Sequence, residues 1–220
     1  MSVVALLLAG VGLADLLPRW RHAVALLVVV AAALGLGAGW HTLWIALLVL
    51  LVIVVWLDAA SHRSSAGTRV LAVVLLGLLA ASPALRFADA PLQRWYDGLP
   101  VPGLATVPLE RAALAVGILL FLTTAANVVV RQALGAVGPH VLEEEQSLKG
   151  GRLLGPLERW LVFGFAVAGH VAALGALVAA KGILRFPEIS RDTADGMRAE
   201  YVLVGSFVSW TLALAAVPLF

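Results

Sequence analysis

Long apolar runs without a single charge constrain this chain more than any other feature of its sequence. The stretches 23–38 and 42–57 contain no charged residue. A soluble domain of 220 residues has no core large enough to bury several such runs, whereas a helix of about 20 apolar residues crosses a bilayer. Hydrophobic residues make up 62% of the chain and charged residues only 13%, and a soluble domain carries about 25% charge. The sequence therefore predicts an integral membrane protein.

Seven apolar segments are candidates for membrane-spanning helices. They cover residues 3–17, 23–38, 42–57, 70–85, 112–130, 161–180 and 201–220. We expect an all-α bundle of seven spans that forms one integral membrane domain over residues 1–220. Six spans are the alternative, because Asp15 and Pro18 weaken the first segment. The proline-rich connection 86–111 predicts a loop at the membrane interface, either with a short amphipathic helix around Gln93–Asp97 or as an ordered loop with interfacial aromatics.

The distribution of basic residues predicts which side of the membrane faces the cytoplasm, because cytoplasmic loops carry more Lys and Arg. With seven spans, one side holds eight: Arg19, Arg21, Arg63, Arg69, Arg131, Lys149, Arg152 and Arg159. The other side holds seven: Arg86, Arg94, Arg111, Lys181, Arg185, Arg191 and Arg198. This bias of one residue favours a cytoplasmic C-terminus, and we expect the membrane to be a bacterial plasma membrane.

The segment 161–180 has two distinct faces if it is one helix. Small residues recur at every fourth position, which lets a partner helix approach closely; they are Gly164, Ala168, Ala172 and Ala176. Roughly opposite lie Arg159, His170 and Lys181. His170 is expected near the membrane midplane, where an ionisable group is a functional candidate; the alternative is a neutral imidazole bonded to a neighbouring helix.

Two further groups of polar residues follow the helix pattern. Lys181 and Arg185 are expected to meet Glu188 and Glu200 at one membrane surface, as an ion-pair clasp between helices or as the mouth of an anion site. In the segment 112–130, Thr123, Asn127 and Arg131 fall on one helix face. This stripe predicts either hydrogen bonds between helices or the lining of a polar pathway.

A metal site is a further hypothesis for the first third of the chain. Asp15, His22, Asp58 and His62 fall on one side of the predicted membrane, and carboxylate and imidazole groups together suit zinc or manganese. Helix-end capping is the alternative, because the spacing matches no dedicated metal motif. The chain contains no cysteine, which excludes disulfides, thiolate metal sites and cysteine nucleophiles.

Three ordered pieces occur in the last 70 residues or so: G-R-x-x-G-x-L-E-R at 151–159, A-A-K-x-x-x-R-F at 179–186 and E-Y-x-x-x-G-S at 200–206. In these pieces the chain resembles a bacterial family of multi-pass membrane proteins of unknown function. The resemblance implies functional weight for seven polar positions, namely Arg152, Glu158, Arg159, Lys181, Arg185, Glu188 and Glu200. His170 has no counterpart in this pattern.

Three functions remain open on the sequence alone. The first is a non-enzymatic protein that binds or translocates a small anionic or amphiphilic ligand through Lys181, Arg185, Glu188, Glu200, Glu158, Arg159, Asn127 and Arg131. The second is a membrane-embedded hydrolase that uses the metal set. The third is an assembly subunit that packs its small-residue face on a partner. Membrane lipid is the expected partner in all three, and no basic stripe indicates nucleic acid.

Overall fold

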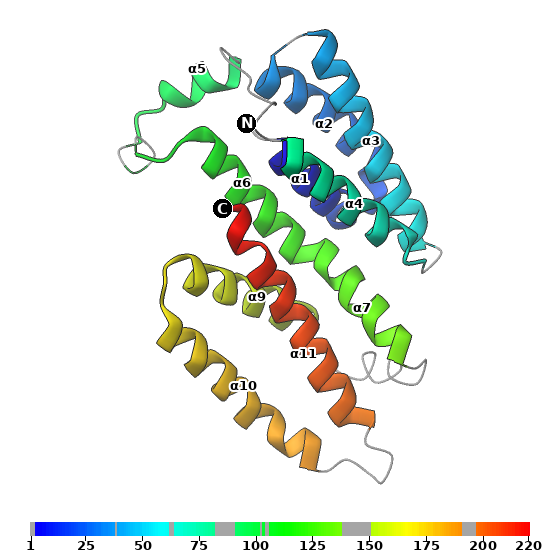
Figure 1. The fold of residues 1–220 in the computed structure, drawn as a ribbon, viewed down its shortest axis with the longest axis vertical. Coiled ribbons are helices and arrows are strands. Elements are labelled where there is room, and N and C mark those ends of the chain that lie inside the picture. Colours follow the sequence, from blue (N-terminus) through cyan, green and yellow to red (C-terminus); the bar gives the residue numbers. More distant parts are fainter. Residues whose placement is uncertain are drawn as a thin grey trace. The chain divides into compact units, whose positions relative to one another are not determined.

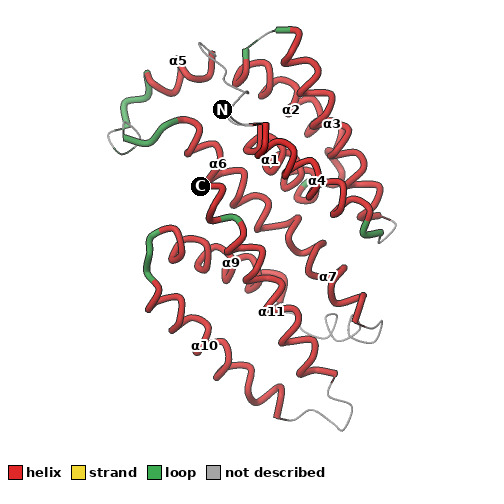
Figure 2. The backbone as a smooth tube through the Cα atoms, in the orientation of Figure 1, coloured by secondary structure: helices red, strands yellow, loops and turns green. Residues whose placement is uncertain are grey.

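The protein is helical throughout the part of the chain that the structure, a computed structural model, describes. That part comprises residues 3–37, 39–61, 64–81, 91–101, 103, 106–137, 151–190 and 197–220, and it contains no strand (Figure 2). The expected all-α class is therefore confirmed. The chain divides into two compact units, Met1–Phe121 and Leu122–Phe220, which are drawn in sequence colours in Figure 1.

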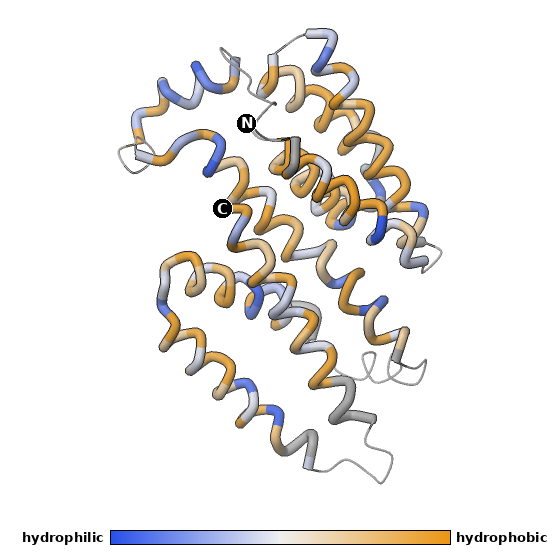
Figure 3. The backbone as a smooth tube through the Cα atoms, in the orientation of Figure 1, coloured by the Kyte–Doolittle hydropathy of each residue, from blue (hydrophilic) through white to orange (hydrophobic). Residues whose placement is uncertain are grey.

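Three helices are long and apolar enough to cross a membrane: Trp40–Ala60, Leu109–Ala136 and Val202–Leu219. Shorter apolar helices cover Val3–Leu16, Ala23–Leu36 and Ala66–Leu79. Figure 3 shows these segments as mostly orange tube. The structure is thus compatible with a membrane location, and the number of seven spans stays a prediction.

Unit 1 follows the expected helices closely. In chain order it contains α1 (Val3–Leu16), the 3-10 turn η1 (Pro18–Trp20), α2 (Arg21–Leu36), α3 (Trp40–Ser61), α4 (Ala66–Ala81), α5 (Pro91–Asp97) and α6 (Leu109–Leu120). Gly37 has φ +85°, a left-handed conformation that glycine adopts without steric cost. It follows the last residue of α2, and α3 begins at Trp40 and packs against α2.

Helix α1 lies at the centre of unit 1, in contact with α2, α3, α4 and α6. Apart from Asp15 in its last turn it is apolar on all sides, which is typical of a buried helix, and Leu7 and Val11 are fully buried. A Cβ atom on Gly12 would lie 2.6 Å from the carbonyl carbon of Leu120, and one on Gly117 would lie 2.6 Å from the carbonyl oxygen of Ala5. The two glycines therefore allow the backbones of α1 and α6 to touch.

The connection before α6 contains the short helix that the sequence suggested. Helix α5 covers Pro91–Asp97, and the amide of Gln93 donates a 2.7 Å hydrogen bond to Asp97 one turn later. The hydroxyl of Tyr96 donates to the carbonyl oxygen of Val107 at 3.0 Å, which holds the loop to the residues just before α6. Trp95 is 61% exposed, as expected for an interfacial aromatic.

Unit 2 is built around α11 (Met197–Ala215), which contacts α7 (Ala126–Val137), α9 (Gly151–Val167) and α10 (Val171–Ser190) (Figure 1, red helix). A π-helical stretch, η2 (Phe121–Ala125), joins α6 to α7, so residues 109–136 form one long helix. A 3-10 turn, η3 (Val217–Leu219), follows α11 and contacts α9.

The segment 161–180 is not one helix, contrary to the expectation. Helix α9 ends at Val167, and α10 begins at Val171. Gly169 has φ +71°, the N–H of His170 donates to Phe165 O at 2.8 Å, and the N–H of Gly169 donates to Ala166 O at 3.1 Å. These are the two bonds of a Schellman motif, which ends a helix at a left-handed glycine.

The turn overturns two expectations that required a single helix. His170 lies exposed in the turn rather than in the middle of a helix. Gly164 belongs to α9, Ala168 to the turn, and Ala172 and Ala176 to α10, so these four residues do not share one helix face. The expectation was wrong because an apolar run without proline or charge hides the turn, and only glycine at position 169 makes it possible.

Candidate functional site

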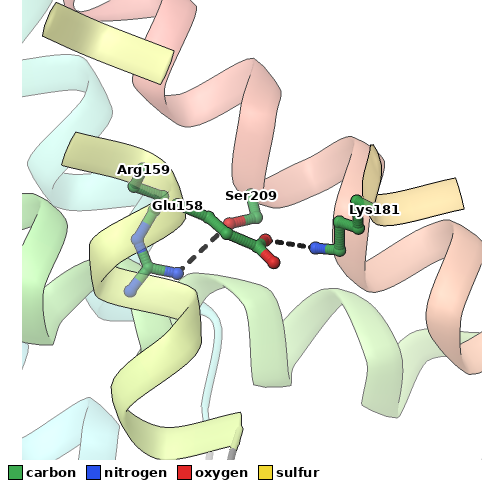
Figure 4. A network of polar contacts seen from close by, with 4 residues as sticks. All are labelled: Glu158, Arg159, Lys181 and Ser209. Atoms are coloured by element: carbon green, nitrogen blue, oxygen red, sulfur yellow. Dashed lines mark hydrogen bonds and ion pairs between the residues drawn. The ribbon is translucent and has the colours of Figure 1, made fainter. Parts of the chain in front are cut away.

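A buried polar network lies inside unit 2, with Arg159 of α9 at its centre (Figure 4). Arg159 is only 2% exposed. Its Nε donates to Leu122 O at 2.6 Å, its Nη1 to Ser209 Oγ at 3.2 Å, and its Nη2 to Asn127 Oδ1 at 2.6 Å. One guanidinium thus binds the π-helical stretch, α7 and α11. All three acceptors are electrically neutral.

The π-helical stretch explains why a backbone oxygen is available to Arg159. In a π turn the hydrogen bonds run from i to i+5, so the regular α pattern of carbonyl acceptors is interrupted. A side chain can enter the helix at such a point, and Arg159 Nε binds the carbonyl of Leu122 there. The Asn127 amide donates back to Thr123 O at 3.1 Å, and Trp160 Nε1 donates to Thr123 Oγ1 at 3.1 Å.

Gly155 provides space for the guanidinium one turn earlier on α9. A Cβ atom at this position would lie 3.5 Å from Arg159 Nη1 and 3.9 Å from Asn127 Oδ1. Those are ordinary van der Waals distances for a methyl group, but a longer side chain would occupy the position of the guanidinium. The glycine and arginine of the G-x-L-E-R segment are thus packed against each other.

A second set of contacts joins α9 to α10 and α11. Glu158 forms an ion pair with Lys181 (Figure 4), and their side chains are 13% and 17% exposed, respectively. The Lys181 ammonium also lies 5.3 Å from the centroid of the Trp210 ring, within the range of a cation–π interaction. Trp210 Nε1 is buried and has no hydrogen-bond partner among the residues that the structure describes.

The structure brings four of the eight predicted ligand-binding residues into this network: Asn127, Glu158, Arg159 and Lys181. Arg185 lies one turn after Lys181 on α10 and is half-buried, whereas Arg131 is exposed on α7. The side chains of Glu188 and Glu200 lie outside the described residues. The expected meeting of Lys181 with those two acids is therefore not described; Glu158 is the acid that pairs with it.

Sequence reasoning missed Leu122, Ser209 and Trp210. Leu122 contributes only its backbone oxygen, which no side-chain pattern reveals. Ser209 and Trp210 lie in an apolar segment, and neighbouring positions of a helix point in different directions, so their approach to Arg159 and Lys181 depends on how α9, α10 and α11 cross.

The metal candidates are described only in part. Asp15 Oδ2 accepts a 2.8 Å hydrogen bond from Trp56 Nε1, and Trp56 is 1% exposed, so the carboxylate satisfies a buried indole. Asp58 is exposed. His62 and the side chain of His22 lie outside the described residues, among which no group of three potential metal ligands occurs. The four-residue metal set stays a prediction.

Helix α10 has its charged face turned inward and its apolar face turned outward. Lys181 faces α9 and α11 through its contacts with Glu158 and Trp210. On the other side Ala179, Gly182, Ile183 and Phe186 line a shallow open groove of about 390 Å³. Ile183 is 73% exposed and Phe186 66% exposed. A helix in water shows the reverse arrangement.

Comparison with protein families, with curated proteins and with solved structures finds no match to this chain. Any functional assignment therefore depends on the network in unit 2 itself.

Proposed function

We propose that this chain is a multi-pass integral membrane protein of the bacterial plasma membrane that binds or translocates a small anionic or amphiphilic ligand. The ligand would bind at Arg159, beside the Glu158–Lys181 ion pair of the same network. The proposal depends above all on the charge balance of that network. It contains two cations and one anion, and the described hydrogen-bond acceptors of Arg159 are all neutral.

An excess positive charge in a buried site has a physical cost that an anion would relieve. A buried ion is stabilised only when it is paired or fully hydrogen-bonded, and even well-bonded charges lose much of their hydration energy. Glu158 is engaged by Lys181, so Arg159 is the cation that a bound carboxylate or phosphate would neutralise. Asn127 and Ser209 would then supply neutral polar groups beside it.

The depth of Arg159 supports the same proposal. Its acceptors Leu122 and Ser209 lie at the middle of two candidate spans, Leu109–Ala136 and Val202–Leu219. Ionisable side chains at such a depth are rare, face the protein interior and mark substrate or ion pathways. The outward apolar face of α10 lies one helix away and suits the tail of an amphiphile better than a fully polar ion.

A structural role is the second candidate, because the network also fastens helices together. Arg159 connects α9 to the π-helical stretch, α7 and α11, and Lys181 connects α10 to α9 and α11. In that case the charges form a clasp in an assembly subunit, and they need no ligand.

Two variants with matched chemistry distinguish these candidates. Arg159→Gln removes the excess charge, whereas the double variant Glu158→Gln with Lys181→Gln removes an ion pair and leaves the net charge unchanged. The readout is thermal stabilisation of the detergent-purified protein by octanoate and, separately, by inorganic phosphate. A ligand site predicts stabilisation of the wild type and of the double variant, and its loss in Arg159→Gln. No stabilisation of the wild type, with both variants melting at lower temperature, would favour the clasp.

A further inference from the structure

Two contacts, one polar and one aromatic, define the direction in which α9 runs relative to α11. Arg159 binds Ser209 near the middle of α11. Four residues later on α9, Phe163 packs against Phe220 at the end of the chain, with ring centroids 5.9 Å apart. The chain of α9 from 159 to 163 therefore runs in the same direction as the chain of α11 from 209 towards 220. The turn at Ala168–His170 lies beyond Phe163, at the Phe220 end of unit 2.

Helix α10 returns from that turn to the opposite end. It packs against α9 and α11, and the Lys181–Glu158 pair joins positions about equally far from the turn. Residues 191–196 then join Ser190 to the start of α11. The lengths of α9 and α10, 17 and 20 residues, correspond to about 25 and 30 Å at the helical rise. The hydrocarbon layer of a bilayer is about 30 Å thick.

We infer that α9 and α10 cross the membrane separately, and that the outer face of α10 lies against lipid hydrocarbon. Lipid is the occupant that fits this face because the face is apolar along its whole described length, from Val171 to Phe186, while Lys181 is turned inward. Large side chains such as Ile183 and Phe186 project from it. Polar residues of membrane helices face the protein interior in the same way.

The separate crossings change the sidedness of the chain. In sequence, the stretches that lead into α9 and out of α10, residues 131–152 and 185–198, contain six basic residues: Arg131, Lys149, Arg152, Arg185, Arg191 and Arg198. Neither residues 161–180 nor residues 201–220 contain a Lys or an Arg. The positive-inside rule then assigns the Ser190 end to the cytoplasm. His170 and Phe220 face the other side, opposite to the sidedness expected from seven spans.

Single cysteines test this topology directly, because the chain has none of its own. Ala136→Cys, His170→Cys and Ser190→Cys all replace exposed residues, and a membrane-impermeant maleimide is applied to right-side-out and to inside-out vesicles. We expect His170→Cys to react only in right-side-out vesicles, and the other two only in inside-out vesicles. Reaction of Ala136→Cys and Ser190→Cys from opposite sides would mean that α9 and α10 together cross the membrane only once. A His170→Cys that reacts from neither side would also overturn the inference, as would the reverse orientation.

The lipid contact has its own readout. A nitroxide attached to Ile183→Cys should collide with oxygen much more often than with a water-soluble nickel complex, because oxygen concentrates in hydrocarbon. A nitroxide attached to Val162→Cys, at a position that is 1% exposed, should collide rarely with both oxygen and the nickel complex. Low collision with both at position 183 would mean that a second protein covers α10, and predominant collision with nickel would mean that the face is in water. Both results would contradict the inference, and neither depends on whether the network binds a ligand.

Discussion

Arg159 donates a 2.6 Å hydrogen bond from Nε to the carbonyl oxygen of Leu122, inside a π-helical stretch of another helix. The bond couples an irregular backbone to a buried charge. Without the guanidinium, that carbonyl would be left in an apolar interior, and without the π turn the guanidinium would lose its shortest backbone contact. The two features stabilise each other.

Replacement of Arg159 by methionine should destabilise the protein strongly. The variant removes three hydrogen bonds and leaves Leu122 O and Asn127 Oδ1 without a donor, which we expect to lower the free energy of unfolding by about 3 kcal/mol. Arg159→Lys should recover about a third of that loss, because an ammonium reaches fewer acceptors. Equilibrium unfolding in mixed micelles measures both. Equal stability of the methionine variant and the wild type would mean that the network contributes nothing.

The Glu158–Lys181 pair should behave as a coupled pair in a double-mutant cycle. Each single change, Glu158→Gln or Lys181→Gln, leaves a mostly buried charge without its partner and should cost about 2 kcal/mol. The double variant should cost clearly less than the sum, because it leaves no unpaired charge. Additive losses in the same unfolding assay would show that the two groups do not interact.

Gly169 should resist replacement, whereas Gly164 should tolerate it. Gly169→Ala places a side chain at φ +71° and should lower stability by about 1–2 kcal/mol. Gly164 lies inside α9, and no neighbouring atom lies within 4 Å of the position that a Cβ atom would take. Gly164→Ala should therefore be neutral or stabilise the protein by up to about 1 kcal/mol. Thermal melting compares the two. If Gly169→Ala melts like the wild type, α9 and α10 form one helix.

Asp15 should act through its hydrogen bond to Trp56. Asp15→Ala leaves a buried indole N–H without an acceptor and should cost about 1–2 kcal/mol, whereas Asp15→Asn keeps an acceptor oxygen and should cost less. The melting temperature measures the loss of stability in each variant, and the wavelength of maximum tryptophan emission reports on the surroundings of Trp56. Loss of stoichiometric metal from Asp15→Asn, measured by elemental analysis, would contradict this view and support the metal site.

The sequence predicted the helices well where an apolar run ends in a recognisable signal. Helix α1 ends next to Pro18, and α2 ends at Gly37, each within two residues of the expected limit. The helix in 161–180 was misjudged because Gly169 and His170 interrupt an apolar run without any change in composition. A glycine is tolerated in many membrane helices, so its left-handed conformation could not be inferred from sequence.

The candidate site was predicted by residue type but not by partner. Arg159 and Lys181 stand out in the sequence because buried charges are rare in apolar surroundings. Their partners depend on the way in which helices cross, which brings Ser209 to Arg159 across 50 positions of the chain. The carbonyl of Leu122 became available only through the π turn, for which the residues Phe121–Ala125 give no sequence signal.

The mass of the intact protein, extracted gently from its own membrane, tests the proposed ligand site most directly. Native mass spectrometry of the wild type should show a discrete adduct of an anionic or amphiphilic molecule. The adduct should persist in the Glu158→Gln, Lys181→Gln double variant and be absent from Arg159→Gln. A wild type that carries no adduct, or an adduct equally abundant in Arg159→Gln, would contradict the account and leave the network as a clasp between helices.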